Sequence, residues 1–419
     1  MKLIKRYEIK NRMKRVVVSH PTGNENTRHT VRALKESNLL QVFITCIACF
    51  PGNVFNRISN IPGFSEFKKR SFYASLDEYT ITYPYWELLR LLKRKIKILP
   101  NISVDFVYHY IDRKVRSYIK KHSVDAVYAY DEGAFETFCY AKGKGIKCLF
   151  DLPIVHWRCY QSLLSQEAIK NPLWAETLGV FSDSKEKLAR KDQELLMADC
   201  VLVASSFTKE SVLNFFPYNL HTSIHVVPYG FPDVYTDRVY DMVKSRKLKF
   251  LFVGRLSQSK GLSYLFDSLS KFQDEVELTV VGYNSYPDCP VLQDNLKKHI
   301  YKGPLSHDEV LIEMRKADVF IFPSLFEGFG MVITEAMSQG TPVIATNRTC
   351  AVDFVENGVN GWVIEAGSTE SLDNAILDVL KRRESLADIG YKAMETAMKR
   401  PWSCYEKELS NVINSYLDD

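Results

Sequence analysis

The chain has 419 residues, of which 46% are hydrophobic and 25% are charged, and its formal net charge is +5. This composition is ordinary for a soluble globular protein, the length suffices for about two to three domains, and no apolar run approaches the roughly 20 residues that span a bilayer. The charge is uneven, because residues 1–120 hold 23 Lys and Arg against 9 Asp and Glu, while the remainder carries a net −9.

Strands and helices are predicted to alternate through the first half. Short apolar runs indicate buried strands, and a 3.6-residue periodicity indicates helices. The expected strands are 15–20, 40–50, 125–130, 147–151, 200–204 and 224–227, with helices from the loop at 20–26 to about 37 and at 132–142. No secretory leader is visible before them, so any membrane contact is expected to be peripheral.

One basic segment of the first half admits two interpretations. Residues 83–99 combine aromatic side chains, leucines and five cations. Such a segment can lie on an anionic membrane surface, where each Lys or Arg contributes about 1 kcal/mol. It can equally be a helix that packs its leucines on the core and exposes its lysines. No nucleic-acid recognition motif accompanies the basic residues, so nucleic acid is not an expected partner.

The nine cysteines are scattered and odd in number. Cys46 and Cys49 form a C-x-x-C pair, but they lie in an apolar run without a second ligand pair nearby. Buried strand cysteines are therefore expected there, and not a redox or metal site. The whole set is typical of a reducing, cytoplasmic compartment.

The second half follows a polar, irregular stretch at 230–247, which is predicted to be a linker. A strand at 248–253 leads to a helix from about Gly261, and strands at 319–322 and 342–345 enclose another helix. β/α alternation on both sides of a linker predicts an α/β protein of two doubly wound, Rossmann-like domains that face each other across a cleft.

A glycine turn in the second half has the features of a sugar-nucleotide site. Glu327 and Glu335 lie eight residues apart around a turn that opens a helix directly after a buried strand. Free N–H groups and the helix dipole at such a start favour negative charge. Carboxylates would repel a bare phosphate but accept hydrogen bonds from sugar hydroxyls. The plain alternative is a common strand–helix turn with solvated glutamates.

Two cations lie on an earlier loop of the same half. Arg255 and Lys260 follow the strand at 248–253 and precede the helix from Gly261. Two cations on a strand-to-helix loop suit a diphosphate, and charge-assisted contacts contribute roughly 1.5–3 kcal/mol each. The alternative is a pair of solvated loop residues.

These segments together resemble glycosyltransferase family 4, whose members are retaining enzymes with the GT-B fold. The likeness is carried by VGRLSQSKG (253–261), PSLFEGFGMVITEAMSQGTPVIA (323–345), VVPYGF (226–231) and NGVNGWVIEAGSTESL (357–372). It implies an acceptor-binding domain at 1–230, a nucleotide-sugar-binding domain at 231–401, and a C-terminal helix, 402–419, that returns to the first domain.

The resemblance also implies roles for particular residues. Glu327 and Glu335 match the E-x7-E pattern, with Glu327 as a catalytic residue at the sugar and Glu335 on the ribose. The expected donor-binding residues are Gly23, Arg255, Lys260, Gly328, Phe329, Gly330, Met331, Val332 and Glu335.

The first domain should add a polar group near the end of the strand at 147–151. Either Asp151 or His156 could fill this catalytic position, and a helix cap or a packed ring are the structural alternatives. Asn24, Asn26 and His29 could bind acceptor hydroxyls, or they could simply cap and pack a helix start.

The expected chemistry needs no cofactor. The sequence has no Asp-x-Asp triplet and no cluster with metal-ligand spacing, so no metal is expected, and Arg255, Lys260 and a helix dipole would stabilise the departing diphosphate. The predicted partners are a UDP, GDP or dTDP sugar and a glycan or lipid-pyrophosphate-linked acceptor, as in bacterial surface polysaccharide assembly. The predicted location is cytoplasmic, with contact to an anionic membrane left open. A sugar-nucleotide epimerase and a non-catalytic partner in glycan assembly are the alternatives.

Overall fold

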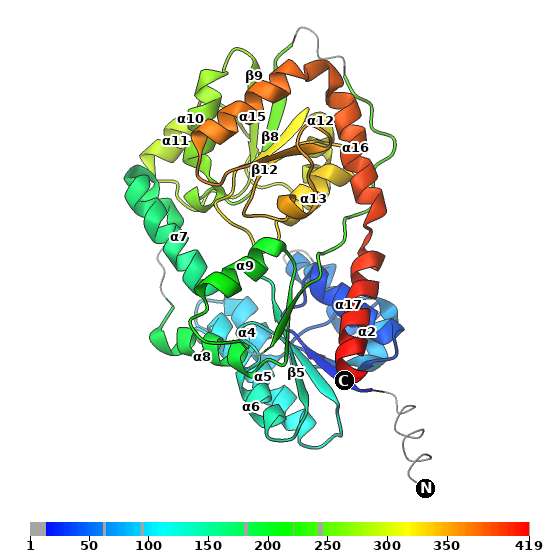
Figure 1. The fold of residues 1–419 in the computed structure, drawn as a ribbon. Helices are drawn as coiled ribbons and strands as arrows, with labels where there is room; N and C mark the ends of the chain where they lie inside the picture. Colours follow the sequence, from blue (N-terminus) through cyan, green and yellow to red (C-terminus); the bar gives the residue numbers. More distant parts are fainter. Residues whose placement is uncertain are drawn as a thin grey trace.

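Two parallel β-sheets organise the chain into two lobes (Figure 1). The computed structural model describes residues 14–61, 64–93, 96–179, 183–220, 222–241 and 246–418. The first-lobe sheet has the strand order β3-β2-β1-β4-β5-β6-β7, and the second-lobe sheet has the order β10-β9-β8-β11-β12-β13. This is the pair of doubly wound α/β domains that the sequence predicts.

The first lobe comes from residues before 227. Its strands are β1 (Val16–Ser19), β2 (Leu40–Thr45), β3 (Thr80–Thr82), β4 (Ala126–Tyr130), β5 (Lys147–Leu152), β6 (Cys200–Val203) and β7 (Ser223–Val226). Its α-helices are α2 (Glu25–Glu36), α3 (Val54–Ser59), α4 (Tyr85–Lys93), α5 (Val104–Ile119), α6 (Phe135–Lys142), α7 (Trp157–Lys170), α8 (Lys185–Met197) and α9 (Ser206–Phe215), with 3-10 helices η1 (Ser65–Arg70), η2 (Ala74–Tyr79) and η3 (Pro172–Leu178).

The second lobe follows the stretch after β7. Its strands are β8 (Leu248–Val253), β9 (Val276–Val281), β10 (Ile300–Tyr301), β11 (Val319–Phe322), β12 (Val343–Thr346) and β13 (Gly361–Ile364). Its helices are η4 (Gln258–Lys260), α10 (Leu262–Lys271), α11 (Pro290–Leu296), α12 (His307–Lys316), α13 (Met331–Ser338), α14 (Ala351–Phe354), α15 (Thr369–Lys381), η5 (Arg383–Ser385) and α16 (Leu386–Lys399), and α17 (Trp402–Asp418) ends the chain.

Burial on both faces explains why the strands read as continuous apolar runs. Every residue of β1, β11 and β12 is buried, as expected for parallel strands covered by helices on both sides. Parallel pairing also brings the carboxyl ends of all strands in a sheet to one edge. Loops that leave this edge can therefore meet at the cleft.

The predicted strands and helices are confirmed in position, with three differences at their ends. The strand expected to reach residue 50 ends at Thr45, so Cys46 and Cys49 are buried beyond it and not within it. Burial raises the pKa of both thiols, that of Cys49 to about 11. In the described part of the basic segment at 83–99, residues 85–93 form α4, whose Leu88 and Leu91 pack on the first-lobe core.

The third difference concerns the helix expected at 132–142, which begins at Phe135. The backbone of Glu132 is in the left-handed region, with φ +72°, so it cannot continue a helix. The carboxylate of Glu194 accepts hydrogen bonds from the backbone N–H groups of Glu132, Ala134 and Phe135 and holds this turn in place.

The C-terminal helix returns to the first lobe. The red ribbon of α16 and α17 runs from the second lobe to the first in Figure 1. There His29 of α2 stacks on Trp402 with ring centroids 4.1 Å apart, and Thr30 and Tyr405 share a hydrogen bond of 2.8 Å. Within the described ranges, no helix combines the length and apolar character needed to cross a membrane.

Part of the chain before residue 230 packs on the second lobe. Trp174 of η3 stacks on Phe266, and Glu167 of α7 accepts a hydrogen bond of 2.9 Å from the hydroxyl of Tyr264. The side chain of Gln258 also donates to Glu167, at 2.7 Å. The lobes are thus joined by α7 and η3 on one side and by α17 on the other.

Candidate functional site

A pocket of about 320 Å³ lies between the lobes, where loops from both sheets meet. The first lobe contributes Glu132, Ile154, Val155, Trp157, Tyr160, Asp183 and Lys191, and the second lobe contributes Ser259, Lys260, Phe326, Glu327 and Gly328. These residues follow the carboxyl ends of β4, β5, β8 and β11 or lie on α7 and α8, except Asp183, which lies in the loop before α8. We call this cavity the cleft pocket.

Two predicted residues meet at the second-lobe side of the cleft pocket. Lys260 and Glu327 form an ion pair, and Glu327 also accepts a hydrogen bond of 2.7 Å from the hydroxyl of Ser324. The loop that carries Lys260 depends on Gly261, whose φ is +72°. A Cβ atom there would lie 2.0 Å from the carbonyl oxygen of Pro323, so only glycine fits both the backbone and the space.

The predicted glycine turn touches the first lobe directly. A Cβ atom on Gly328 would lie 2.0 Å from the carbonyl oxygen of Pro153. The carbonyl of Gly328 accepts hydrogen bonds from the hydroxyls of Ser205 and Thr208 at 2.7 and 2.8 Å. The two lobes therefore contact each other through the backbone of the turn next to Glu327.

The rest of the turn opens α13. Gly330, with φ +95°, is the residue before the helix, and Met331 and Val332 are half-buried in its first turn. Phe329 is buried against Tyr229, with ring centroids 4.9 Å apart. Only the backbone of Phe329 is thus placed to contribute to a site at the helix N-terminus.

Glu335 and Arg255 lie on the second lobe outside the cleft-pocket lining. Burial raises the pKa of Glu335, and the nearby His307, whose Nδ1 is 3.9 Å from Oε1, opposes that rise. The charge of Glu25 on α2 raises it further. Arg255 is exposed, and its guanidinium lies 3.3 Å from the hydroxyl of Tyr286.

Neither predicted catalytic group of the first lobe lines the cleft pocket. Asp151 is buried and accepts a hydrogen bond of 2.6 Å from Tyr128, and burial raises its pKa to about 7. His156 is the N-cap of α7, where Nδ1 accepts from the N–H of Arg158 at 3.3 Å, and burial lowers its pKa to about 4. The expectation that one of them faces the pocket is not met, because both side chains are held inside the first lobe.

The residues expected on the loop after β1 also have partners within the lobe. Gly23 has φ +67° and lies so close to Phe72 that a Cβ atom would be 2.3 Å from its ring. Asn24 caps α2 by accepting from the N–H of Thr27, and Asn26 donates to the hydroxyl of Tyr229 at 2.9 Å. None of the three lines the cleft pocket.

His29 is held at the contact between α2 and the C-terminal helix. Its Nδ1 lies 2.5 Å from Glu406, and its Nε2 lies 3.3 Å from Glu25. Burial lowers the pKa of His29, but the hydrogen bonds to Glu25 and Glu406 outweigh this effect and raise it overall. This arrangement corrects the expectation of an acceptor contact, since the ring is buried between two helices.

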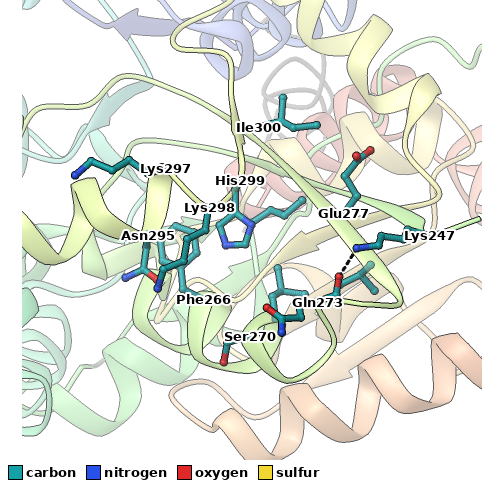
Figure 2. Close-up of a pocket in the computed structure, with 13 residues that line it drawn as sticks. Lys247, Phe266, Ser270, Gln273, Glu277, Asn295, Lys297, Lys298, His299 and Ile300 are labelled. Carbon is teal, nitrogen blue, oxygen red and sulfur yellow. Dashed lines mark hydrogen bonds between the residues drawn. The ribbon is translucent and has the colours of Figure 1, made fainter.

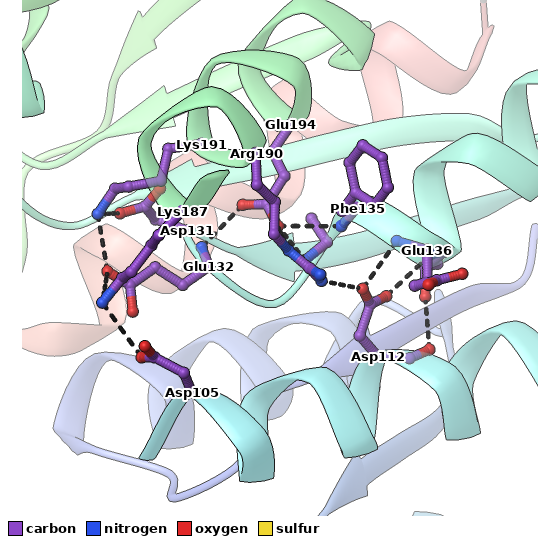
Figure 3. A network of polar contacts seen from close by, with 12 residues as sticks. Asp105, Asp112, Asp131, Glu132, Phe135, Glu136, Lys187, Arg190, Lys191 and Glu194 are labelled. Atoms are coloured by element: carbon purple, nitrogen blue, oxygen red, sulfur yellow. Dashed lines mark hydrogen bonds and ion pairs between the residues drawn. The ribbon is translucent and has the colours of Figure 1, made fainter. Parts of the chain in front are cut away.

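The structure adds an acidic and basic cluster that the sequence analysis missed (Figure 3). Nζ of Lys191 lies 2.7 Å from Asp131 and 2.8 Å from Glu132, and Lys187 lies 3.3 Å from Glu132. The signal was present, because the Asp-Glu pair stands directly after β4, at the carboxyl edge of the sheet. The lysines that pair with Asp131 and Glu132 lie on α8, more than 50 residues later, so the local periodicity of the sequence could not predict these ion pairs.

A larger cavity of about 520 Å³ lies elsewhere on the second lobe (Figure 2). Its lining includes Lys247, Val276 and Ile300, which stand at the amino ends of β8, β9 and β10. Nζ of Lys247 is bound there to the carbonyl of Gln273 at 2.7 Å, and His299 stacks on Phe266. Because ligands of open α/β sheets bind at the carboxyl ends of the strands, the smaller cleft pocket is the candidate site.

Among the described residues, no group of three or more His, Cys, Asp or Glu side chains could hold a metal ion. The three carboxylates that line the cleft pocket are paired with lysine side chains: Glu132 with Lys191, Asp183 with Lys187 and Glu327 with Lys260.

In sequence comparison, residues 241–396 match the model of the family described as glycosyl transferases group 1. An uncharacterized glycosyltransferase of Methanocaldococcus jannaschii is 32% identical over 154 residues, which cover 36% of this chain and 44% of the relative. The capsular polysaccharide biosynthesis glycosyltransferase CapM of Staphylococcus aureus is 26% identical over 236 residues, or 52% of this chain and 59% of the relative. The chain thus matches about half the length of these relatives.

Structural comparison covers nearly the whole chain. HepE of Anabaena, in complex with UDP and glucose, superposes with a TM-score of 0.61 over 96% of this chain and 100% of that one, at 16% identity. Likeness at this identity concerns the fold alone. Together with the two doubly wound lobes, it identifies the fold as GT-B, as predicted.

Proposed function

We propose that the protein is a retaining glycosyltransferase that moves a sugar from a nucleotide-sugar donor to a glycan or lipid-linked acceptor. The observation that carries the proposal is the meeting of Lys260 and Glu327 at a cleft between two GT-B lobes. The match of residues 241–396 to the glycosyl transferase group 1 family supports it, because both residues lie in that range.

The donor would occupy the second-lobe side of the cleft. Arg255 and Lys260 follow β8 and would bind the diphosphate, together with the first N–H groups of α13 after Gly330. Glu335, further along α13, would accept hydrogen bonds from the ribose hydroxyls. UDP is the first nucleotide to test, since HepE, which has the same fold, is known with UDP and glucose bound.

The reaction follows from where charge develops. The bond between the sugar C1 and the phosphate oxygen breaks, which leaves negative charge on the diphosphate and positive charge on the ring. Lys260 and Arg255 stabilise the first, and the carboxylate of Glu327 stabilises the second. The acceptor oxygen then bonds to C1 on the leaving-group face, and its proton passes to the departing phosphate oxygen. This path retains the anomeric configuration and uses no metal.

An anionic membrane would supply a lipid-linked acceptor. Exposed apolar side chains cluster between α4 and α5, and they include Tyr85, Ile96, Ile98 and Val104. Lys93 and Lys97 lie beside them, and Trp86 of α4 contacts Phe106 of α5. The start of α4 follows β3, so Tyr85 stands near the carboxyl edge of the first-lobe sheet. Apolar side chains flanked by lysines favour peripheral binding to anionic lipid.

Product analysis tests the proposal. The purified protein is incubated with UDP-, GDP- or dTDP-sugars and a panel of saccharide and lipid-linked acceptors, and the new linkage is read by NMR. The expected result is a product with the anomeric configuration of the donor, formed equally well after treatment with a chelator. Inversion would contradict the mechanism, and conversion of the donor sugar without any acceptor would favour an epimerase.

A further inference from the structure

The first-lobe wall of the cleft pocket is aromatic. Trp157 and Tyr160 of α7 line the pocket, and the ring of Tyr160 lies edge-on to Phe326 of the second lobe at 5.4 Å. The indole of Trp157 is fixed in place, because its N–H donates to Asp192 at 2.9 Å and the guanidinium of Arg158 lies 4.1 Å from its ring centre. A rigid aromatic surface suits the apolar C–H face of a sugar ring.

The charged groups of the lining do not favour an anion. The lining contains three carboxylates, of Glu132, Asp183 and Glu327, against two lysines, Lys191 and Lys260. Each lysine is already paired with a carboxylate of the lining, Lys191 with Glu132 at 2.8 Å and Lys260 with Glu327. The third carboxylate, of Asp183, pairs with Lys187 of α8 at 3.0 Å, and no cation of the lining is left without a carboxylate partner. All these groups lie beyond residue 120, so the basic excess of residues 1–120 is not at the pocket.

The position of Glu132 is maintained at the cost of backbone strain. Its φ of +72° is unfavourable for a residue with a Cβ atom, and three of the N–H groups around it are bound by the buried Glu194. Strained residues held by their surroundings are concentrated at binding and catalytic sites. Figure 3 shows how Lys187 and Lys191 hold the carboxylate of Glu132 from the side of α8.

We infer that this wall is the acceptor subsite and that it takes an uncharged pyranose. The sugar face packs on Trp157 and Tyr160, while Glu132 and Asp183 accept hydrogen bonds from the sugar hydroxyls. A uronate or a sugar phosphate would offer the same hydroxyls, but the two carboxylates would repel its negative charge. This inference rests on the proposed function, since it supplies the acceptor for the same transfer.

Acceptor competition in the full-length protein tests the inference. Release of nucleoside diphosphate is measured with the donor alone and with methyl glucoside, galactoside, mannoside or N-acetylglucosaminide, each against its uronide or 6-phosphate. At least one neutral glycoside should raise turnover above the acceptor-free rate, with its charged counterpart at least tenfold poorer. Equal or better use of the charged sugars would overturn the inference.

Two variants locate the subsite. Trp157→Ala and Asp183→Asn should each raise the acceptor KM at least tenfold while the nucleoside diphosphate dissociation constant changes less than twofold. Asp294→Asn, which removes a second Asp–Lys pair on the surface of the second lobe, should change neither. If Asp183→Asn weakens nucleotide binding as much as acceptor binding, the subsite assignment is wrong. If wild-type protein neither binds a nucleotide nor turns over a donor, the proposed function fails, and the acceptor subsite fails with it.

Discussion

Lys260 and Glu327 neutralise each other at the second-lobe side of the cleft pocket, with Ser324 as a further donor to the same carboxylate. The two residues come from loops after different strands, β8 and β11, which lie next to each other in the sheet. A diphosphate entering the cleft would offer Lys260 a second anion, and Glu327 would then be free to face the sugar ring. The pair is therefore the part of the site that donor binding should rearrange.

Replacing Lys260 tests this relationship. Lys260→Ala removes a phosphate-binding cation and leaves Glu327 without its partner, so nucleoside diphosphate binding should weaken about 10- to 100-fold, which corresponds to roughly 1.5–3 kcal/mol. Isothermal titration measures the change. Lys297→Ala, an exposed lysine paired with Asp294, is the control and should bind as wild type. Equal weakening in both variants would indicate a general charge effect.

Glycine should be required at position 261 both for its backbone conformation and for the lack of space for a side chain. Gly261 and Gly145 have nearly equal φ values of +72° and +69°, but a Cβ atom would meet Pro323 only at Gly261, while nothing lies within 4 Å at Gly145. Gly145→Ala should cost about 1–2 kcal/mol. Gly261→Ala should lower the melting temperature further and weaken nucleotide binding, because the loop with Lys260 must move. Identical thermal shifts for the two variants would contradict this reading.

Asp151 should make stability depend on pH. Burial raises its folded-state pKa from 3.8 to about 7, so between about pH 4 and 7 the folded protein binds more protons than the unfolded chain, and the free energy of unfolding falls as the pH rises. Asp151→Asn cannot ionise and still accepts from Tyr128. The free energy of unfolding of this variant relative to wild type should therefore increase between pH 5 and pH 7.5, by about 2.5 kcal/mol. A difference that does not change with pH would show that Asp151 ionises normally.

Two matched substitutions test whether the patch between α4 and α5 contacts a membrane. Ile98 is 91% exposed in the patch between α4 and α5, and Ile169 is 83% exposed near the end of α7. In flotation with phosphatidylglycerol vesicles, Ile98→Asp should reduce binding severalfold, and Ile169→Asp should not, because Ile98 belongs to the segment at 83–99 with its five cations and Ile169 lies outside it on α7. Binding that neither substitution affects, or that neutral vesicles support equally, would exclude this patch as the contact.

The sequence predicted the strands well because their signal is local. The run at 319–322 is apolar throughout, and the Glu327 turn and the Lys260 loop each lie within a short segment whose order matches a known family. The first-lobe site was predicted less well. Asp151 and His156 are polar residues near a strand end, but their orientation depends on Tyr128 and Arg158, and only packing decides it.

For Glu132, the prediction of secondary structure was wrong. It was assigned to a helix because its neighbours have helical periodicity, yet Glu194, about 60 residues later, binds the N–H groups that a helix would have used. A long-range side chain thus overrides local propensity. Similarly, the sequence around His29 predicts a ligand-binding side chain, but α17, from the other end of the chain, packs over its ring.

Nucleotide binding at Glu335 is the most direct test of the account. Titration of the wild-type protein with UDP, GDP and dTDP should give one nucleotide that binds with a 1:1 stoichiometry, and Glu335→Ala should bind it at least tenfold more weakly, a loss of about 1.4 kcal/mol or more. If none of the three nucleotides binds, or if Glu335→Ala binds as tightly as wild type, the nucleotide-sugar site is not where the account places it.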